Sequence, residues 1–165
     1  MIGSLSALFR YNLKNVEHKI ALAQELKIAR DYMYLQQMRF GSRIEYQEDI
    51  RVNVDEVIVP SYLLQPLIEN SIIHGLARKE KGGWVKVRVK WVNNDLHVIV
   101  GDNGIGIPRK HLETIRKTFE TGDFKGIGVG NIYKRIRSNM WKGSMTISSK
   151  ENMGTIIRII IPNNR

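Results

Sequence analysis

The residues best placed to do chemistry follow an apolar run, where Val98-Ile99-Val100-Gly101 leads into Asp102-Asn103-Gly104-Ile105-Gly106. An aspartate at the end of a buried strand is costly unless its carboxylate meets hydrogen-bond donors. Because an ionised carboxylate only accepts hydrogen bonds, Asp102 suits a ligand that presents N–H groups, such as the amine edge of adenine. Gly104 and Gly106 would let the backbone take positive φ and approach a flat ring. The alternative is an ordinary Asp-Asn-Gly turn at the edge of a sheet.

A second polar group interrupts an apolar segment, residues 60–75, that is predicted to be a helix closed by Gly75. Asn70 and His74 are four residues apart, so they share one face of that helix, with Glu69 beside them. Polar side chains on such a face need partners. The alternative is an amphipathic face that meets water, with Glu69 solvated and His74 near the helix end.

A third group, Gly126-Ile127-Gly128-Val129-Gly130-Asn131, stands directly before an amphipathic helix predicted over residues 132–140. Backbone N–H groups at the positive end of a helix suit phosphate. A dinucleotide-binding turn would need an apolar strand upstream and a glycine at position 131, and the chain has a polar loop and Asn131. No Gly-Lys-Ser/Thr phosphate loop occurs in the sequence, so a nucleotide would be held without that device.

The elements that must position these groups follow from hydrophobic periodicity. Strands at 84–91 and 96–100 are joined by so short a turn that they must pair antiparallel. Helical spacing appears at residues 5–16 and 22–38, a further helix is predicted over 108–119, and residues 120–125 fit neither period and are predicted to be a loop. Strands are also predicted at 43–52, 144–149 and 155–161, with Thr155 near the pocket.

Composition excludes several classes of protein. The 165 residues, 42% hydrophobic and 25% charged, are enough for one soluble globular domain with a helical appendage. No apolar run approaches the roughly 18 residues of a membrane helix, and the first residues lack a signal-peptide pattern. The absence of cysteine rules out disulfides and thiolate metal sites.

The net charge of +10 allows nucleic acid, anionic lipid or a polyphosphate ligand as a partner. Lys86, Arg88 and Lys90 alternate with valines, which favours the solvated face of a strand over a nucleic-acid-binding arm.

Taken in order, the three groups resemble the N box and the two glycine boxes of the Bergerat-type ATP-binding domain. Residues 63–70 and 34–41 are also similar to the LytS-type sensor histidine kinases, and the resemblance extends from about Leu5 to Pro162. It implies an α+β fold, a two-layer α/β sandwich with a mixed, mostly antiparallel sheet and helices on one face, preceded by an N-terminal helical segment. Residues 1–40 would be the end of the dimerisation and phosphoacceptor region, and residues 41–165 the ATP-binding catalytic domain.

The resemblance also implies roles for single residues. Asp102 would read the adenine amine, Asn70 would bind Mg²⁺ beside the ATP phosphates, Glu69 would be the catalytic base or orienting group, and His74 would touch phosphate. The remaining residues implied around the nucleotide are Gly104 and Gly106 in the base pocket, Gly126, Gly128 and Gly130 in a lid, and Thr155 near the adenine.

The function implied is transfer of the ATP γ-phosphate to a histidine upstream of this chain, because no Pro-His-Phe-type motif is present and His18 lies in the wrong context. We expect a response regulator as partner, a homodimer in the full-length protein, no nucleic acid, and a cytoplasmic domain tied to a membrane only through missing upstream segments.

Two alternatives stay open from the sequence. Another Bergerat-fold ATPase or an anti-sigma-factor serine kinase would share the three motifs, although residues 34–41 argue against both. A non-enzymatic basic module that binds nucleic acid would have the glycine motifs as mere turns, and ATP binding would distinguish it from the enzymes.

Overall fold

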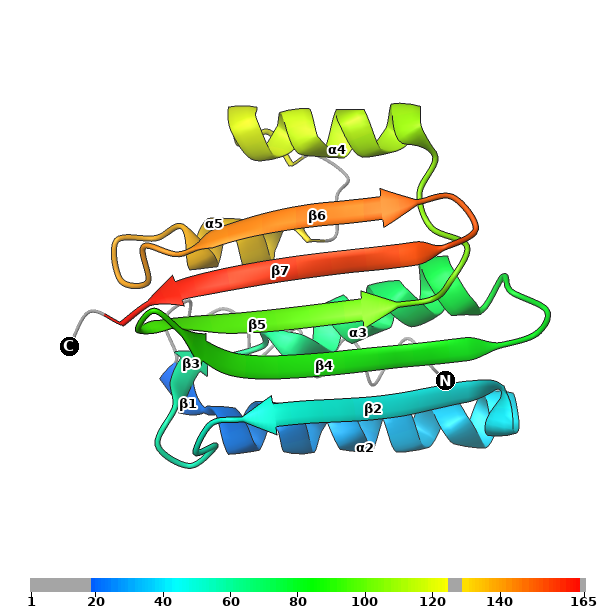
Figure 1. Ribbon diagram of the computed structural model, residues 1–165, viewed down its shortest axis with the longest axis horizontal. Helices are drawn as coiled ribbons and strands as arrows, with labels where there is room; N and C mark the ends of the chain where they lie inside the picture. The colour runs from blue at the N-terminus through cyan, green and yellow to red at the C-terminus, as the bar shows by residue number, and fades with distance from the viewer. Residues whose placement is uncertain (1–18, 125–128, 164–165) are drawn as a thin grey trace.

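The computed structural model describes residues 19–124 and 129–163, which are built around a five-stranded sheet (Figure 1). In spatial order the strands are β2 (Ile44–Arg51), β4 (Gly83–Val92), β5 (Asp95–Asp102), β7 (Gly154–Pro162) and β6 (Ser144–Lys150). The β2–β4 pair is parallel and the other three pairs are antiparallel. The predicted mixed, mostly antiparallel sheet is therefore confirmed.

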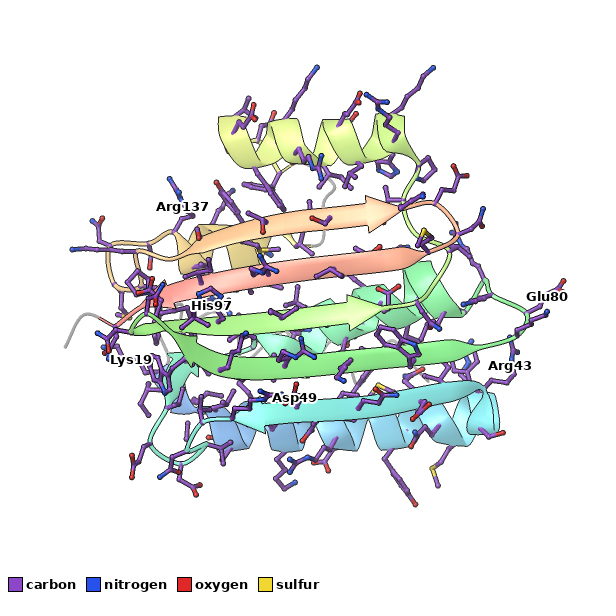
Figure 2. All side chains as sticks on the ribbon, viewed as in Figure 1. Lys19, Arg43, Asp49, Glu80, His97 and Arg137 are labelled. Carbon is purple, nitrogen blue, oxygen red and sulfur yellow. The ribbon has the colours of Figure 1, made fainter. Side chains whose placement is uncertain are left out.

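One face of this sheet is buried and the other is open. Val85, Val87 and Val89 of β4 are fully buried, whereas Lys86, Arg88 and Lys90 between them are partly exposed. Helices lie behind the sheet in Figure 1, and Figure 2 shows Asp49 and His97 on the open face toward the viewer. Strict alternation along β4 produces this two-sided pattern because successive side chains point to opposite faces, so the interpretation of the lysines and arginine as an exposed strand face is confirmed.

Helix α2 (Leu22–Phe40) confirms the predicted second helix and belongs to the same hydrophobic core. Leu22, Leu26, Ala29 and Met33 recur at helical spacing and are at most 1% exposed. They join the buried side chains of the sheet and of α3 (Leu64–Asn70) in one cluster. The division of the chain at residue 40 remains a prediction.

The predicted helix over residues 60–75 is wrong at both ends. Residues Ile58–Pro60 form a short strand, β3, which pairs antiparallel with β1 (Lys19–Ala21). The helix α3 begins only at Leu64 and continues as a π-helical turn, η3 (Ser71–Leu76). Gly75 lies inside that turn and does not cap it, because Ala77 N–H still donates to Ile72 O at 2.8 Å. An apolar run alone does not distinguish strand from helix at its start.

The remaining helices lie near β6, the edge strand of the sheet. Helix α4 (Arg109–Thr121) packs on β6, and α5 (Gly130–Ile136) lies behind β6 and β7 (Figure 1). The predicted loop over 120–125 is wrong at its start, because α4 runs to Thr121 and Gly122 ends it with φ +74°. Helix α5 ends at Ile136, short of the expected residue 140, and a 3-10 turn, η2 (Gly41–Arg43), follows α2.

Some expectations fall on residues that the structure does not describe. The first predicted helix, at 5–16, and the lid residues Gly126 and Gly128 lie outside the described residues. Within the described ranges, no helix has the length and apolar character needed to cross a bilayer.

Candidate nucleotide-binding site

A cavity of about 470 Å³ opens between the helical segment α3–η3, the turn after β5, and the start of α4. Its size falls within the range of about 300–1,000 Å³ that is usual for small-molecule sites. The predicted site residues on its wall are Asn70, His74, Asp102, Gly106 and Thr155. Two of the three motifs therefore meet at one cavity, together with Thr155 of β7, and the third motif adds Val129 to the lining.

Asp102 supplies the buried acid of the cavity and is 5% exposed. Its Oδ1 accepts a hydrogen bond from the Gly104 N–H at 2.9 Å, and Ser71 and the backbone of Thr155 also donate to the carboxylate. Burial nevertheless raises the pKa of the Asp102 carboxyl above its ordinary value, because desolvation outweighs these donors and the charge of Lys79. The carboxylate is therefore held in place and poorly solvated, which favours a ligand that brings a further N–H donor.

Thr155 faces Asp102 because the two residues are register partners on β7 and β5. Its Oγ1 lies 2.9 Å from the Oγ of Ser149. Ser149 in turn donates to Gly154 O at 2.8 Å and accepts from the Ile107 N–H at 2.9 Å. This serine connects the β6–β7 hairpin to the turn after β5 and fixes one rim of the cavity.

Another part of the wall comes from the helical segment that carries Asn70 and His74. Asn70 ends α3 and His74 lies in the π-helical turn, and both line the cavity. Arg78, just beyond this turn, and His111 on α4 also line it. His74, Arg78 and His111 thus give the cavity basic side chains, which suit an anionic portion of a ligand.

The two glycines that follow Asp102 have different positions. Gly104 is buried against Gly75 and is not part of the cavity wall. Gly106 does line the cavity, and its φ of +68° is a backbone conformation that L side chains rarely adopt. Gly104 therefore allows close packing behind the cavity, and Gly106 allows the turn itself.

Two other predicted residues lie outside the cavity wall. Glu69, partly buried on α3, accepts a hydrogen bond from Gln65 Nε2 at 3.0 Å and does not line the cavity. Gly130 begins α5 beneath Phe124, whose Cβ would lie 2.3 Å from a Cβ at this position. Its backbone neighbour Val129 lines the cavity instead.

Sequence reasoning missed several residues that build the site. Ser71, Arg78, His111 and Ser149 were not singled out, and neither was Asn103, whose Oδ1 accepts from the Trp84 N–H at 2.7 Å. Ser71 lies between Asn70 and His74, and Arg78 comes four residues after His74, just beyond the helical segment, so their spacing could have found them. Ser149 could only be found from the strand register, which depends on pairing across the β6–β7 hairpin.

Comparison with protein families gives two matches. The model described as histidine kinase-, DNA gyrase B-, and HSP90-like ATPase matches residues 56–165, which include α3, the cavity and α5. A second model, described as histidine kinase, matches residues 1–44, which include α2.

Individual relatives also include sensor histidine kinases. The chain is 31% identical to a sensor-like histidine kinase of Staphylococcus epidermidis over 98% of its length, and 30% identical to the sensor protein kinase HptS of Staphylococcus aureus over all of it. It spans 32% of each of these two relatives and 53% of a Bacillus subtilis relative, YwpD.

Solved structures share the fold. The catalytic domain of histidine kinase ThkA superposes with a TM-score of 0.63 at 19% identity, covering 88% of this chain and 95% of that one. The histidine kinase domain of an Erythrobacter litoralis blue-light activated kinase gives a TM-score of 0.62 at 19% identity, covering 87% and 61%.

Proposed function

The chain belongs to the family of histidine kinase-, DNA gyrase B- and HSP90-like ATPases and is the ATP-binding catalytic domain of a sensor histidine kinase, and on this premise we propose how its residues bind ATP and transfer phosphate. The chain spans only about a third to a half of the length of its curated relatives. The activity, substrate and partners of the whole protein are therefore part of the proposal.

The observation that carries the proposal is the buried Asp102 carboxylate, which lines the same cavity as Asn70 and His74. The carboxylate already accepts from Gly104 N–H and still has acceptor capacity. The exocyclic amine of adenine supplies the missing donor. Thr155, the register partner of Asp102, would contact the same edge of the base, and Gly106 would shape the pocket beside it.

The triphosphate would extend from this end along the helical wall. His74, Arg78 and His111 offer cationic or N–H groups that neutralise phosphate charge. Phosphoryl transfer depends mainly on positioning and charge neutralisation, so these side chains would contribute by holding the γ-phosphate in place.

Magnesium fits this site only together with the phosphates. The described residues contain no group of three or more His, Asp or Glu side chains that could hold a metal alone. Mg²⁺ typically uses one or two protein oxygens and takes its other ligands from phosphate and water. The Asn70 amide oxygen on the cavity wall meets that requirement, and the ion would neutralise charge on the transferred phosphoryl group.

Glu69 would act from the edge of the site. It is one residue before Asn70 and is oriented by the Gln65 amide. We assign it the role of base or orienting group for the attacking nucleophile. Gly126, Gly128 and Gly130 would form the lid, of which only Gly130 is within the described residues.

In the reaction, the imidazole nitrogen of a histidine upstream of this chain attacks the γ-phosphorus, the bond to the β,γ-bridging oxygen breaks, and ADP leaves. The acceptor's N–H proton is removed, with Glu69 as the candidate base. The phosphoryl group then passes to a response regulator. The sensor kinases among the relatives support a response regulator as partner. A homodimeric, membrane-anchored full-length kinase belongs to the same proposal.

Labelling of the full-length protein with γ-labelled ATP and Mg²⁺ tests this function. We expect an acid-labile, alkali-stable label, which is the signature of phosphohistidine. An acid-stable label would indicate a serine kinase instead, and release of labelled phosphate without any labelled protein would indicate a simple ATPase.

A further inference from the structure

Glu25 of α2 is a buried carboxylate with an unusual set of partners. It is 1% exposed, and it accepts hydrogen bonds from the backbone N–H groups of Tyr62 at 2.5 Å, Leu63 at 2.8 Å and Leu64 at 2.8 Å. These donors stand at the start of α3, where backbone N–H groups have no partner within the helix. The residue at the N-cap position, Leu63, has no polar side chain to cap them. Glu25 therefore caps α3 from a different helix.

Arg135 of α5 holds the same turn from another side. Its Nη1 donates to Ser61 O, and the side chain is half-buried. The positive charge of Arg135 lies close enough to Glu25 to lower the pKa of the Glu25 carboxyl, against the larger effect of burial that raises it. Residues 61–64 are thus clamped between α2 and α5, and we call Glu25, Arg135 and this turn the clamp.

The clamp connects both walls of the cavity. Asn70 lies six residues after Leu64, so along an α-helix it is displaced by about 9 Å from the capped end. Val129, which also lines the cavity, immediately precedes α5, the helix that carries Arg135. A shift of the turn at 61–64 would therefore move the Asn70 wall relative to the Val129 wall.

Stability alone does not account for this arrangement. A serine, threonine or aspartate at the N-cap position would cap α3 without burying a charge far from water. A buried ionic group is weak evidence for stability, because desolvation offsets much of its attraction. A charge contributed by α2 has a different consequence: it ties the position of α3 to the position of α2.

We propose that Glu25 and Arg135 are positioning residues of the nucleotide site, which set Asn70 and His74 relative to Val129 and couple the position of α2 to nucleotide affinity. This inference rests on the proposed function, since it names ATP with Mg²⁺ as the ligand whose affinity is coupled. Helix α2 lies in the part of the chain that matches the histidine kinase model, whereas α3 and α5 lie in the part that matches the ATPase model. The clamp is a direct polar connection between these two parts.

The test compares Glu25→Gln with Glu48→Gln in the 165-residue chain. Glu48 also contacts α2, through an ion pair with Arg30 at 2.6 Å, but it does not touch the turn at 61–64. Calorimetry with Mg²⁺ and ATP should show affinity weakened about tenfold or more in Glu25→Gln, and little change in Glu48→Gln. Hydrogen exchange of the nucleotide-free chain should be faster across residues 64–76 only in Glu25→Gln.

A merely structural role predicts a different result. Val89→Ala, in the core at a register position distant from Asp102, lowers the melting temperature without touching the clamp and serves as the stability control. All variants are measured at a temperature where each is folded. If Glu25→Gln melts as early as Val89→Ala and binds ATP like the wild type, the proposal is overturned.

If Glu25→Gln does not fold, substitutions of Arg135 provide a second test of the proposal. We expect Arg135→Met to weaken Mg²⁺-dependent ATP affinity and Arg135→Lys to restore part of it; equal affinity in both and in the wild type overturns the inference. Should the wild-type chain itself bind no ATP, the proposed function fails. Exchange across residues 64–76 still tests the clamp in that case.

Discussion

Gly75 of the π-helical turn and Gly104 of the turn after β5 meet backbone to backbone: a Cβ on Gly104 would lie 2.5 Å from the Gly75 Cα. The same Cβ would lie 2.8 Å from Asp102 Oδ1. The main chain is also joined here, because Ile105 N–H donates to Gly75 O at 3.1 Å. The helix that carries Asn70 and the turn that carries Asp102 can approach this closely because Gly104 has no side chain; a Cβ on Gly75 would be less crowded, with Asp102 Oδ1 at 3.0 Å as its nearest neighbour.

Replacement of Gly104 by alanine should therefore separate the two walls. We expect Gly104→Ala to lose about 1–3 kcal/mol in unfolding free energy, as overpacking does, and to weaken ATP binding. Gly101→Ala is the matched control, because its Cβ would meet nothing closer than 3.6 Å. Urea unfolding and calorimetric titration of both variants check this, and similar behaviour of the two would contradict it.

The adenine assignment of Asp102 predicts discrimination by a single amine. The wild-type chain should bind ATP more tightly than purine riboside triphosphate, which lacks the amine, by about 1–3 kcal/mol, the cost of leaving a buried polar group unpaired. In Asp102→Asn the preference should shrink, because the new amide can present an N–H to the amine. Competition titrations of the two proteins with the two nucleotides give the coupling energy between the Asp102 side chain and the adenine amine. A coupling energy near zero would mean that the adenine binds elsewhere.

Asn70→Ala should remove the effect of Mg²⁺ on ATP affinity and leave metal-independent ATP binding unchanged. We expect unchanged ATP affinity in EDTA and loss of most of the gain produced by Mg²⁺, because in the proposed site the Asn70 amide oxygen would be the protein's ligand to the ion. Titration of Mg²⁺ against ATP affinity measures this. If the variant kept the full response to Mg²⁺, Asn70 would not be the ligand and Glu69 would be the next candidate.

Glu69→Gln separates chemistry from binding. Glu69 does not line the cavity, so the variant should bind Mg²⁺ and ATP like the wild type, whereas phosphorylation of the upstream histidine should slow about 10²-fold or more, as loss of a general base does. Single-turnover labelling of the full-length protein measures the rate. Unchanged phosphoryl transfer would remove Glu69 from the mechanism.

The buried carboxyl of Glu25 predicts a direction of pH dependence. Burial raises the pKa of this carboxyl in the folded chain above its ordinary value of 4.5. At a pH between the ordinary pKa and the raised pKa, the folded state therefore binds more protons than the unfolded state. Unfolding free energy contributed by this group therefore falls as pH rises through that window and is constant above it. The unfolding free energy of the wild type minus that of Glu25→Gln, from urea unfolding at pH 4 to 8, should fall as pH rises. A difference that grows would mean that the three N–H donors outweigh burial.

The sequence by itself determined the features that repeat or lie close along the chain. Alternation in residues 84–91 specified the two-sided strand β4, and the short turn after it specified antiparallel pairing with β5. The order of the three motifs was sufficient to indicate the family and to name five residues on the cavity wall. Periodicity and motif spacing express local backbone geometry, which each segment carries with it.

Only the tertiary structure decided how segments far apart meet. The β1–β3 pair, the approach of Gly75 to Gly104, and the capping of α3 by Glu25 from 37 to 39 residues away leave no periodic signal in the sequence. The same holds for the placement of Glu69 outside the cavity, although it stands next to Asn70 on the same helix. Such contacts depend on where folding brings whole elements together, because a side chain's partners are set by the packing of helices on the sheet.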